Sequence, residues 1–597
     1  MSLGKKLLPL SIVLSAGLLT NVANAQKDQP FIAAAVEFNP TFHELDKNIS
    51  SLSSDIEKAL KKGAKLVVAP EMATTGYLYE SREEIAPYVD TIPGKTTNEL
   101  AKLAKKYHAY IVTGMAERDN ETGIFYNSSV LVGPEGVVGK YRKIHQWESE
   151  EHWAAWGDLG FPIFDTELGK IAINICMDSG YFESSRIPAL GGADIIAFPT
   201  NSSIQAIYYN QARAMQNGVY IVEANRNNTE KDFHMVGMSA VWNPSGNKVI
   251  EAPFVSKEDK SPESTQIVYG KIDPQEFVQR EIKLEGRRPE LYQPLMFHIA
   301  PWNYKVDNTE REITSVAIQY QPSIGDKSTN LTSVTKLVAQ LKDVDLAVLP
   351  EYSLTGERKI MSKDVAKEWA EPLNGFTFKH MSQLAKDRVI NLVYTQIEQD
   401  GNDYYVTSVV LGKSGELIGS YRKTHLNSQE QTWAKAGNSI KSINVPEVGN
   451  LGIMLGEEVL YPEIAGVLSG QRVDIIAIPS SWAGEYGGYV QVNQKAVANP
   501  YPENSMVLWD AVAFSAQAYT VVANFVGSEN KYRGESALYT LDPLYGLDQA
   551  KVASSNEAQA LTVQFKTKNH DWWLNQSNMV TSRRTPYYKP LILPPKI

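Results

Sequence analysis

The sequence contains an internal repeat with a constant spacing of 280 residues. The segment LVVAPEMATTGY, which includes Glu71, returns as LAVLPEYSLTGE around Glu351. The segment GKYRKIH around Lys143 returns as GSYRKTH around Lys423, and ADIIAFPTNSS returns as VDIIAIPSSWA at the same spacing. One spacing held over more than 120 residues indicates that a whole structural unit has been duplicated. The chain should therefore contain two domains of one fold.

The expected boundaries place one domain at 26–300 and the other at 313–597, with a linker at 301–312. Within a copy, short β-branched apolar runs such as KLVVAP and KIAINIC are typical of buried strands. Between two such runs, apolar residues recur every three or four positions, as on one face of a helix, at Leu45, Ile49, Leu52, Ile56 and Leu60. Gly63 fits the position just past the end of that helix. Alternating strands and helices predict an α/β fold with helices packed on sheets.

Residues 1–25 have the pattern of a secretory signal sequence. Two lysines precede the apolar run LLPLSIVLSAGLL, and Ala23 and Ala25 have the small-residue spacing of a cleavage site. The apolar run is shorter than the roughly 20 residues of a membrane-spanning helix, which argues against the alternative of an uncleaved anchor. We therefore expect cleavage before Gln26, a periplasmic or secreted location, and no membrane association afterwards.

Cys176 is the only cysteine among the 597 residues. It cannot form an internal disulfide, and a lone cysteine in an exported protein is a pairing site or a reactive thiol. The net charge of −10, without a basic cluster, argues against nucleic acid as a partner. The nine histidines show neither an H-E-x-x-H motif nor close pairing, so neither a metal nor a cofactor is expected.

Three reactive side chains of the first copy follow or adjoin predicted strands. Glu71 closes the run KLVVAPE, Lys143 lies in KYRKIH, and Cys176 closes KIAINIC. A polar group just past a buried strand is held at the sheet edge, where α/β proteins bind their ligands. Each residue alone has a more ordinary explanation, as core filler or as a solvated side chain. Their occurrence in this order favours a catalytic site.

A thiol, a carboxylate and an ammonium group together can break a carbon–nitrogen bond. A thiol is a poor nucleophile until a base or a nearby positive charge favours the thiolate, and Glu71 can take its proton. Lys143 and the backbone N–H of Met177 can stabilise the oxyanion that forms when sulfur attacks a carbonyl. The acid formed from Glu71 can then protonate the departing nitrogen and later activate water.

The motif series PEMATTGY, YRKIH, CMDSGYFES, ADIIAFPTNSS, QARAMQNGVYIVEANR and RRPELYQPL resembles that of the nitrilase superfamily of carbon–nitrogen hydrolases. The resemblance covers nearly all of the first copy and, more weakly, the second. It implies tandem αββα four-layer sandwich domains and a catalytic set of Glu71, Lys143 and Cys176. The export signal and the RRPELYQPL ending fit the amidase-like members, so a small linear amide is the expected substrate. Nitriles and N-carbamoyl compounds are the alternatives with the same residues.

The resemblance also implies a further glutamate, shortly after the lysine, that helps to position the substrate. Glu148, Glu150 and Glu151 all lie in that window. Glu150 is favoured as the catalytic one because Glu430 holds the same place in the second copy, and Glu151 is the alternative substrate-binding residue.

The second copy lacks the nucleophile. The position 280 residues after Cys176 is Gly456, and no serine or threonine lies between Leu451 and Glu463 to replace the thiol. We therefore predict that residues 313–597 perform no thiol catalysis. Relatives commonly associate as dimers, so the second copy is expected to act as the partner in an internal pseudo-dimer, which is compatible with further homo-oligomerisation. A ligand-binding role of the second copy is the alternative.

Two other interpretations compete with the hydrolase. A papain-like cysteine protease would use His145 or His152 as its base, but the C-G-S-C-W type of signature is missing around Cys176. A non-catalytic binding or scaffold protein of the same fold would be indifferent to blocking of Cys176.

Overall fold

The computed structural model describes most of the chain, namely residues 29–203, 207–258, 265–298, 309–356, 362–483, 487–497, 499–527, 531–541, 549–567 and 574–594. The predicted signal sequence and residues 301–308 of the predicted linker lie outside these ranges. Within them, no helix is both long enough and apolar enough to cross a membrane.

Contacts between Cα atoms divide the chain into two compact units. The first comprises Met1–Cys176, Gly191–Ser202 and Asn217–Ile282. The second comprises Lys283–Ile597 together with two pieces of the first copy, Met177–Leu190 and Ser203–Gln216.

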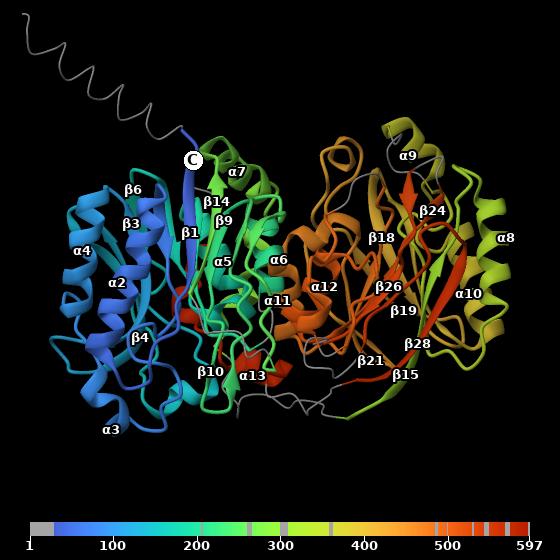
Figure 1. Cartoon of the computed structure of the whole chain (residues 1–597). Helices are drawn as coiled ribbons and strands as arrows, with labels where there is room; N and C mark the ends of the chain where they lie inside the picture. Colours follow the sequence, from blue (N-terminus) through green and yellow to red (C-terminus); the bar gives the residue numbers. More distant parts are fainter. Residues whose placement is uncertain are drawn as a thin grey trace, which may run out of the picture. The chain divides into compact units, whose positions relative to one another are not determined.

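One sheet of the first unit has the strand order β14-β1-β2-β3-β4-β5. Its strands are β1 (Phe31–Glu37), β2 (Ala64–Val68), β3 (Tyr110–Arg118), β4 (Phe125–Gly133), β5 (Gly136–Arg142) and β14 (Gln266–Ile272). Strands β1, β2 and β3 run parallel, and their crossovers are the helices α2 (Leu45–Lys61) and α4 (Lys95–Tyr107). Both helices cover the outer face of this sheet (Figure 1).

Helix α2 confirms the helix predicted from periodicity. Ile49, Leu52, Ile56 and Leu60 are buried, and the helix ends at Lys61. Gly63 follows with a φ of 91°, a left-handed conformation that glycine adopts without a steric penalty.

The other sheet of the first unit has the strand order β13-β12-β9-β8-β7-β6 and packs against the inner face of the first sheet. Its strands are β6 (Ile163–Thr166), β7 (Gly169–Ile173), β8 (Ile195–Pro199), β9 (Tyr220–Ala224), β12 (Ala240–Trp242) and β13 (Lys248–Glu251). Helices α5 (Phe182–Leu190) and α6 (Ile207–Asn217) connect β7 to β8 and β8 to β9, and their residues are grouped mainly with the second unit.

The second unit repeats both sheets strand for strand, in the orders β28-β15-β16-β17-β18-β19 and β27-β26-β23-β22-β21-β20. The first consists of β15 (Glu312–Gln319), β16 (Leu346–Val348), β17 (Asn391–Asp400), β18 (Asp403–Leu411), β19 (Leu417–Arg422) and β28 (Gln559–Lys566). The second consists of β20 (Ile443–Val445), β21 (Gly449–Ile453), β22 (Ile475–Pro479), β23 (Tyr519–Ala523), β26 (Ala537–Tyr539) and β27 (Lys551–Val552).

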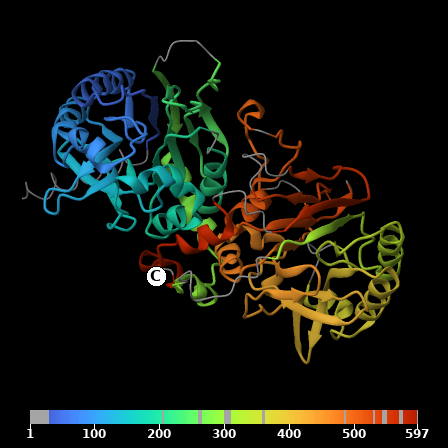
Figure 2. The ribbon, with the colours of Figure 1, turned by 90° about the horizontal axis from the view of Figure 1, so that it is seen from below.

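Helices again flank these sheets. The helices α8 (Lys327–Val338) and α10 (Phe376–Arg388) cover the sheet that contains β15, as the yellow-green helices of Figure 2 show. Helices α11 (Pro462–Gly470) and α12 (Val507–Ala516) pack together, and α12 contacts β23 and β26 of the other sheet. The predicted tandem of four-layer α/β sandwiches is confirmed.

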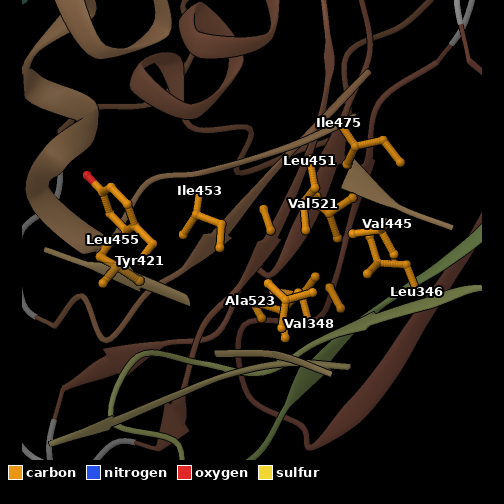
Figure 3. Packing of buried hydrophobic residues seen from close by; sticks show 14 of the residues in the cluster. Leu346, Val348, Tyr421, Val445, Leu451, Ile453, Leu455, Ile475, Val521 and Ala523 are labelled. Carbon is orange, nitrogen blue, oxygen red and sulfur yellow. The ribbon is translucent and has the colours of Figure 1, made fainter. Parts of the chain in front are cut away.

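The core of each sandwich is built from alternate residues of the facing strands. In the second unit, one buried cluster contains Leu346 and Val348 of β16, Leu451 and Ile453 of β21, and Ile475, Val521 and Ala523 (Figure 3). Residues two apart point to one face of a strand, so each strand contributes a row of buried side chains. Burial of each large apolar side chain stabilises the fold by about 1.5–3 kcal/mol. Such cores hold the strand ends rigidly.

Within the second unit, helix α5 of the first copy is tied to helix α11 of the second copy. Arg186 of α5 pairs with Glu463 of α11 at 3.1 Å, and both side chains are fully buried. Arg287 pairs with the same Glu463 oxygen at 2.7 Å. Breaking a buried pair of this kind costs about 3–5 kcal/mol, so these contacts fix α5 firmly against α11.

Candidate active site

Glu71 follows the end of β2 and is fully buried. Its Oε1 accepts hydrogen bonds from Lys143 Nζ at 2.8 Å and from Asn127 Nδ2 at 2.7 Å. Its backbone carbonyl accepts a third hydrogen bond, from Asn201 Nδ2 at 3.0 Å. The carboxylate is therefore held by groups from two other segments of the first unit, and the backbone of Glu71 is held by a third.

Lys143 lies between two buried carboxylates. Immediately after β5, its Nζ donates to Glu71 and to Glu150 Oε1, the latter at 2.5 Å. Burial alone would lower the pKa of Lys143, but Glu150 and Glu71 raise it above its usual range. The lysine is therefore protonated at neutral pH, a fixed positive charge in the site.

Glu150 is the member of the acidic window that reaches this cluster. It is fully buried, and Tyr77 OH donates to its Oε1 at 3.1 Å. Burial raises the pKa of Glu150; Lys143 opposes this rise and the like charge of Glu71 adds to it. Glu150 therefore holds a proton more tightly than an ordinary carboxyl group does.

The neighbouring Glu148 and Glu151 are exposed and do not join the cluster. All three glutamates lie in the short 3₁₀ helix Glu148–His152. Residues three apart eclipse each other in such a helix, so Glu148 and Glu151 share one face and Glu150 points to another. This geometry places Glu151, the alternative substrate-binding residue, on the surface.

Cys176 lies three residues beyond β7, at the start of the 3₁₀ helix Cys176–Gly180. Its φ is 44°, a left-handed conformation that costs a non-glycine residue about 1–2 kcal/mol. Residues held in this way cluster at functional sites. Met177 is the next residue of the same 3₁₀ helix, so its N–H leaves the chain directly beside the thiol-bearing residue.

The thiol lies in the electrostatic field of the cluster. Burial and the negative charge of Glu71 raise the pKa of Cys176 to about 12, while Lys143 and a hydrogen bond with Thr200 oppose the rise. At neutral pH the resting group is thus a neutral thiol. Burial and Glu71 outweigh the positive charge of Lys143, so a base must act during the attack.

Two carboxylate oxygens of the cluster have no partner in the described parts of the chain. Among the described residues, neither Glu71 Oε2 nor Glu150 Oε2 has a hydrogen-bond partner, although both atoms are buried. An unpaired buried acceptor costs about 1–3 kcal/mol, and native proteins retain few of them. Such atoms can accept a proton during a reaction or a hydrogen bond from a bound molecule.

The second copy contains the same cluster with every oxygen paired. Lys423 Nζ donates to Glu351 at 2.8 Å and to Glu430 at 2.7 Å. Ser481 Oγ donates to Glu351 Oε2 at 2.9 Å, and the Asn427 N–H donates to Glu430 Oε2 at 3.0 Å. The acceptors that are unpaired in the first copy are thus satisfied here, as in a structural ion-pair cluster.

Gly456 has the same left-handed backbone conformation as Cys176 but carries no side chain. Its φ of 48° matches that of Cys176, and glycine adopts it without strain. A Cβ built on Gly456 would lie 2.6 Å from Glu351 Oε2. The carboxylate has therefore moved into the space that a side chain at this position would need.

Three partners of the cluster were not identified from the sequence. Asn127 lies in β4, outside the motifs quoted above, while Tyr77 and Asn201 lie within motifs but have no assigned role there. Comparison of the two copies distinguishes Asn127. Lys143 N–H donates to the Asn127 carbonyl, and Lys423 N–H donates to the Val406 carbonyl, so Val406 is the equivalent residue of the second copy. The second copy therefore has an apolar side chain where the first copy has the amide of Asn127.

Comparisons with known proteins identify the family of the chain. The family Carbon-nitrogen hydrolase matches residues 32–280 and 316–543. The chain is similar to a nitrilase of Pyrococcus abyssi, with 42% identity over 229 residues, which are 38% of this chain and 86% of that protein. It is also similar to a citrullinase of Francisella tularensis, with 30% identity over 277 residues, 42% of this chain and 93% of that protein.

A formamidase of Bacillus cereus is 31% identical over 233 residues, 37% of this chain and 70% of that protein. Among solved structures, a carbon–nitrogen hydrolase from Helicobacter pylori covers 45% of this chain and 99% of its own, with a TM-score of 0.40 and 23% identity. The two matched segments make up most of the chain. The chain belongs to the carbon–nitrogen hydrolase family, as a tandem of two such domains.

Proposed function

We propose that the chain hydrolyses the C–N bond of a small linear amide through a thioester on Cys176. The observation that supports this most is the buried cluster of the first copy. Lys143 joins Glu71 and Glu150 there, and one oxygen of each carboxylate lacks a partner among the described residues. The field of this cluster acts on the single cysteine of the chain.

In the acylation step, the carboxylate of Glu71 takes the thiol proton while sulfur attacks the amide carbonyl carbon. The carbonyl π electrons move to oxygen, and the ammonium of Lys143 and the N–H of Met177 stabilise the oxyanion. When the C=O bond re-forms, the C–N bond breaks. The nitrogen leaves as ammonia or an amine with the proton from Glu71, and the acyl group stays on sulfur.

In the deacylation step, Glu71 takes a proton from water as the water oxygen attacks the thioester carbonyl. Collapse of the second oxyanion breaks the C–S bond. The thiolate recovers the proton from Glu71, and the carboxylic acid leaves. Glu150 and Tyr77 take no proton in this cycle; they position Lys143.

The substrate class rests on the resemblance to amidase-like members and on the names of the relatives. Those relatives are named nitrilase, citrullinase and formamidase, so their names point to three kinds of carbon–nitrogen compound. Nitriles and N-carbamoyl compounds would react at the same three residues. Only a substrate screen separates these classes.

The second copy, in this proposal, is silent in the chemistry, and the two copies form an internal pseudo-dimer. Support comes from the loss of the nucleophile at Gly456 and from the fully paired Glu351. Export of the mature chain from Gln26 onward, to the periplasm or the medium, is proposed on the pattern of residues 1–25.

The test is a screen of linear amides, ureido compounds and nitriles for released ammonia, run with the wild type and with Cys176→Ala. We expect turnover of at least one linear amide and a loss of about 10⁴-fold or more in Cys176→Ala. Glu351→Gln is the matched control, because it alters the equivalent cluster of the second copy. Equal turnover by the wild type and Cys176→Ala would contradict the proposal.

A further inference from the structure

A short hairpin in the first unit is hydrogen-bonded to the loop that carries Tyr77. The hairpin consists of β10 (Thr229–Glu230) and β11 (Phe233–His234). Glu230 Oε1 accepts hydrogen bonds from two consecutive N–H groups of the loop, from Tyr77 at 2.7 Å and from Leu78 at 2.8 Å. One oxygen of a buried carboxylate therefore satisfies two backbone donors, through charge-assisted bonds that are stronger than bonds between neutral groups.

Further contacts fix this carboxylate and the loop against each other. Arg226, which is fully buried, forms an ion pair with Glu230 through Nη2 and Oε2 at 2.9 Å. Lys231 Nζ donates to the Leu78 carbonyl at 2.8 Å. Gly76 leaves room for the carboxylate, because a Cβ built there would lie 2.8 Å from Glu230 Oε2. The hairpin thus clamps the loop through the backbone of the loop.

The side chain of Tyr77 extends from the clamped backbone to the catalytic cluster. Its OH donates to Glu150 Oε1 at 3.1 Å, and the same oxygen accepts from Lys143 Nζ. Burial and the negative charge of Glu150 raise the pKa of Tyr77 well above its usual range, so the hydroxyl keeps its proton and remains a donor. The position of this hydroxyl depends on the backbone that Glu230 holds.

The second copy provides the equivalent hydroxyl from a different position. Tyr352 OH donates to Glu430 Oε1 at 2.8 Å. Tyr352 is equivalent to Met72 at the spacing of 280 residues, and both have a left-handed φ, of 57° and 51°. The residue 280 positions after Tyr77 is Glu357, which has no phenol. In the second copy the donor is therefore the residue directly after the cluster glutamate, whereas in the first copy it lies on the loop that the hairpin holds.

The buried cation of the clamp is also specific to the first copy. Arg226 lies two residues after β9, and the residue at the same place after β23 is Phe525. A buried carboxylate requires a charged or hydrogen-bonding partner, which a phenyl ring does not provide. The pairing of Arg226 with Glu230 therefore occurs in the copy that carries the nucleophile.

We propose that Glu230 is a positioning residue of the hydrolytic site, which fixes Tyr77 and, through it, Glu150 and Lys143. The inference rests on the proposed function, in which the ammonium group of Lys143 stabilises the oxyanion. Without the clamp the loop backbone is released, and the Tyr77 hydroxyl no longer holds Glu150 beside the lysine. A displacement of about 1 Å at a catalytic group lowers a rate by about 100-fold. Loss of Glu230 should therefore lower kcat rather than weaken substrate binding.

A double-mutant cycle tests this with kcat and KM of the full-length protein for an amide from the substrate screen. Glu230→Ala and Tyr77→Phe should each lower kcat by about tenfold or more, with KM changed by less than about threefold. The double variant should lose no more than the worse single variant, because Glu230 acts through the hydroxyl that Tyr77→Phe already removes. Losses that multiply in the double variant would overturn the proposal.

Asp90→Ala is the matched control. Asp90 is a buried carboxylate of the same unit that accepts from the N–H groups of Lys95 and Thr96, at 3.2 and 2.7 Å, at the start of α4. Its loss should lower the free energy of unfolding, measured in urea, but leave kcat unchanged. A comparable fall of kcat in Asp90→Ala would attribute the effect of Glu230→Ala to lost stability and overturn the proposal.

Hydrogen exchange followed by mass spectrometry tests the clamp without any turnover. The amides of Tyr77 and Leu78 should exchange at least about tenfold faster in Glu230→Ala, and at the wild-type rate in Tyr77→Phe and Asp90→Ala. An unchanged exchange rate in Glu230→Ala would overturn the proposal. If no amide is hydrolysed by the wild type, the proposed function fails, whereas faster exchange in Glu230→Ala still supports the clamp.

Gly76→Ala serves as a second variant if Glu230→Ala does not fold. Its Cβ displaces the carboxylate from the side of the loop and leaves the ion pair with Arg226 in place. We expect faster exchange at Tyr77 and Leu78 and a lower kcat here as well. Wild-type exchange and wild-type kcat in Gly76→Ala would contradict the proposal.

Discussion

Replacing Glu71 with glutamine should change the two reactions of Cys176 in opposite directions. Glutamine keeps a carbonyl oxygen that can accept from Lys143 and Asn127, so the geometry survives while the negative charge is lost. Because Glu71 raises the pKa of Cys176, its neutralisation lowers that pKa and increases the thiolate fraction. Amide turnover, however, loses its general base.

The magnitudes separate the two effects clearly. A like charge at close range shifts a pKa by about 1–3 units, so Cys176 should move from about 12 to between roughly 9 and 11. At pH 7 the thiolate fraction then rises by about 10- to 1,000-fold. Loss of the general base should lower turnover by about 10²- to 10⁴-fold.

The rate of alkylation by iodoacetamide, measured by mass spectrometry, reports the thiolate fraction of Cys176, because the chain has no other cysteine. The wild-type rate should rise about tenfold per pH unit from pH 7 to about 9.5 without a plateau, since the pKa lies above that range. Glu71→Gln should react faster, and Glu351→Gln at the wild-type rate. A plateau below pH 8 in the wild type, or slower alkylation in Glu71→Gln, would refute this reasoning.

Three further outcomes test the roles of the two clusters. Lys143→Met should abolish turnover and lower the free energy of unfolding by about 3–5 kcal/mol in urea titrations, because two buried carboxylates lose their cation. Lys423→Met should cost a similar free energy of unfolding yet leave turnover per folded molecule intact; lost turnover at unchanged stability would contradict this. Gly456→Cys in a Cys176→Ala background should restore no ammonia release, because Glu351 Oε2 occupies the space that the new side chain needs. Recovery of turnover there would show that the second cluster is still competent.

The sequence predicted the architecture because its signals are local or repeated. The 280-residue spacing led to the tandem, and the periodicity from Leu45 to Leu60 matched α2. The positions of Glu71 and Cys176 beyond apolar runs placed both residues past strand ends, as the structure has them. Residues whose positions follow from the ends of predicted strands could therefore be identified from the sequence.

The rest depends on contacts between distant segments. That Asn127 reaches Glu71 follows from the pairing of β4 with its neighbours, which no local pattern reports. The left-handed backbone of Cys176 is set by the turn that it begins. The difference between unpaired oxygens in the first copy and paired oxygens in the second is a property of side-chain packing. It could not be inferred from the matching residues Glu351 and Lys423.

An acyl group carried by Cys176 is the central intermediate of the proposed hydrolysis. Acid quenching during turnover of an amide from the screen, followed by peptide mass spectrometry, measures this directly. We predict the mass of the acyl group on the peptide that contains Cys176, and no ammonia release once Cys176 has been fully carboxymethylated. An acyl group on another residue, or ammonia release at the wild-type rate after complete carboxymethylation, would contradict the account.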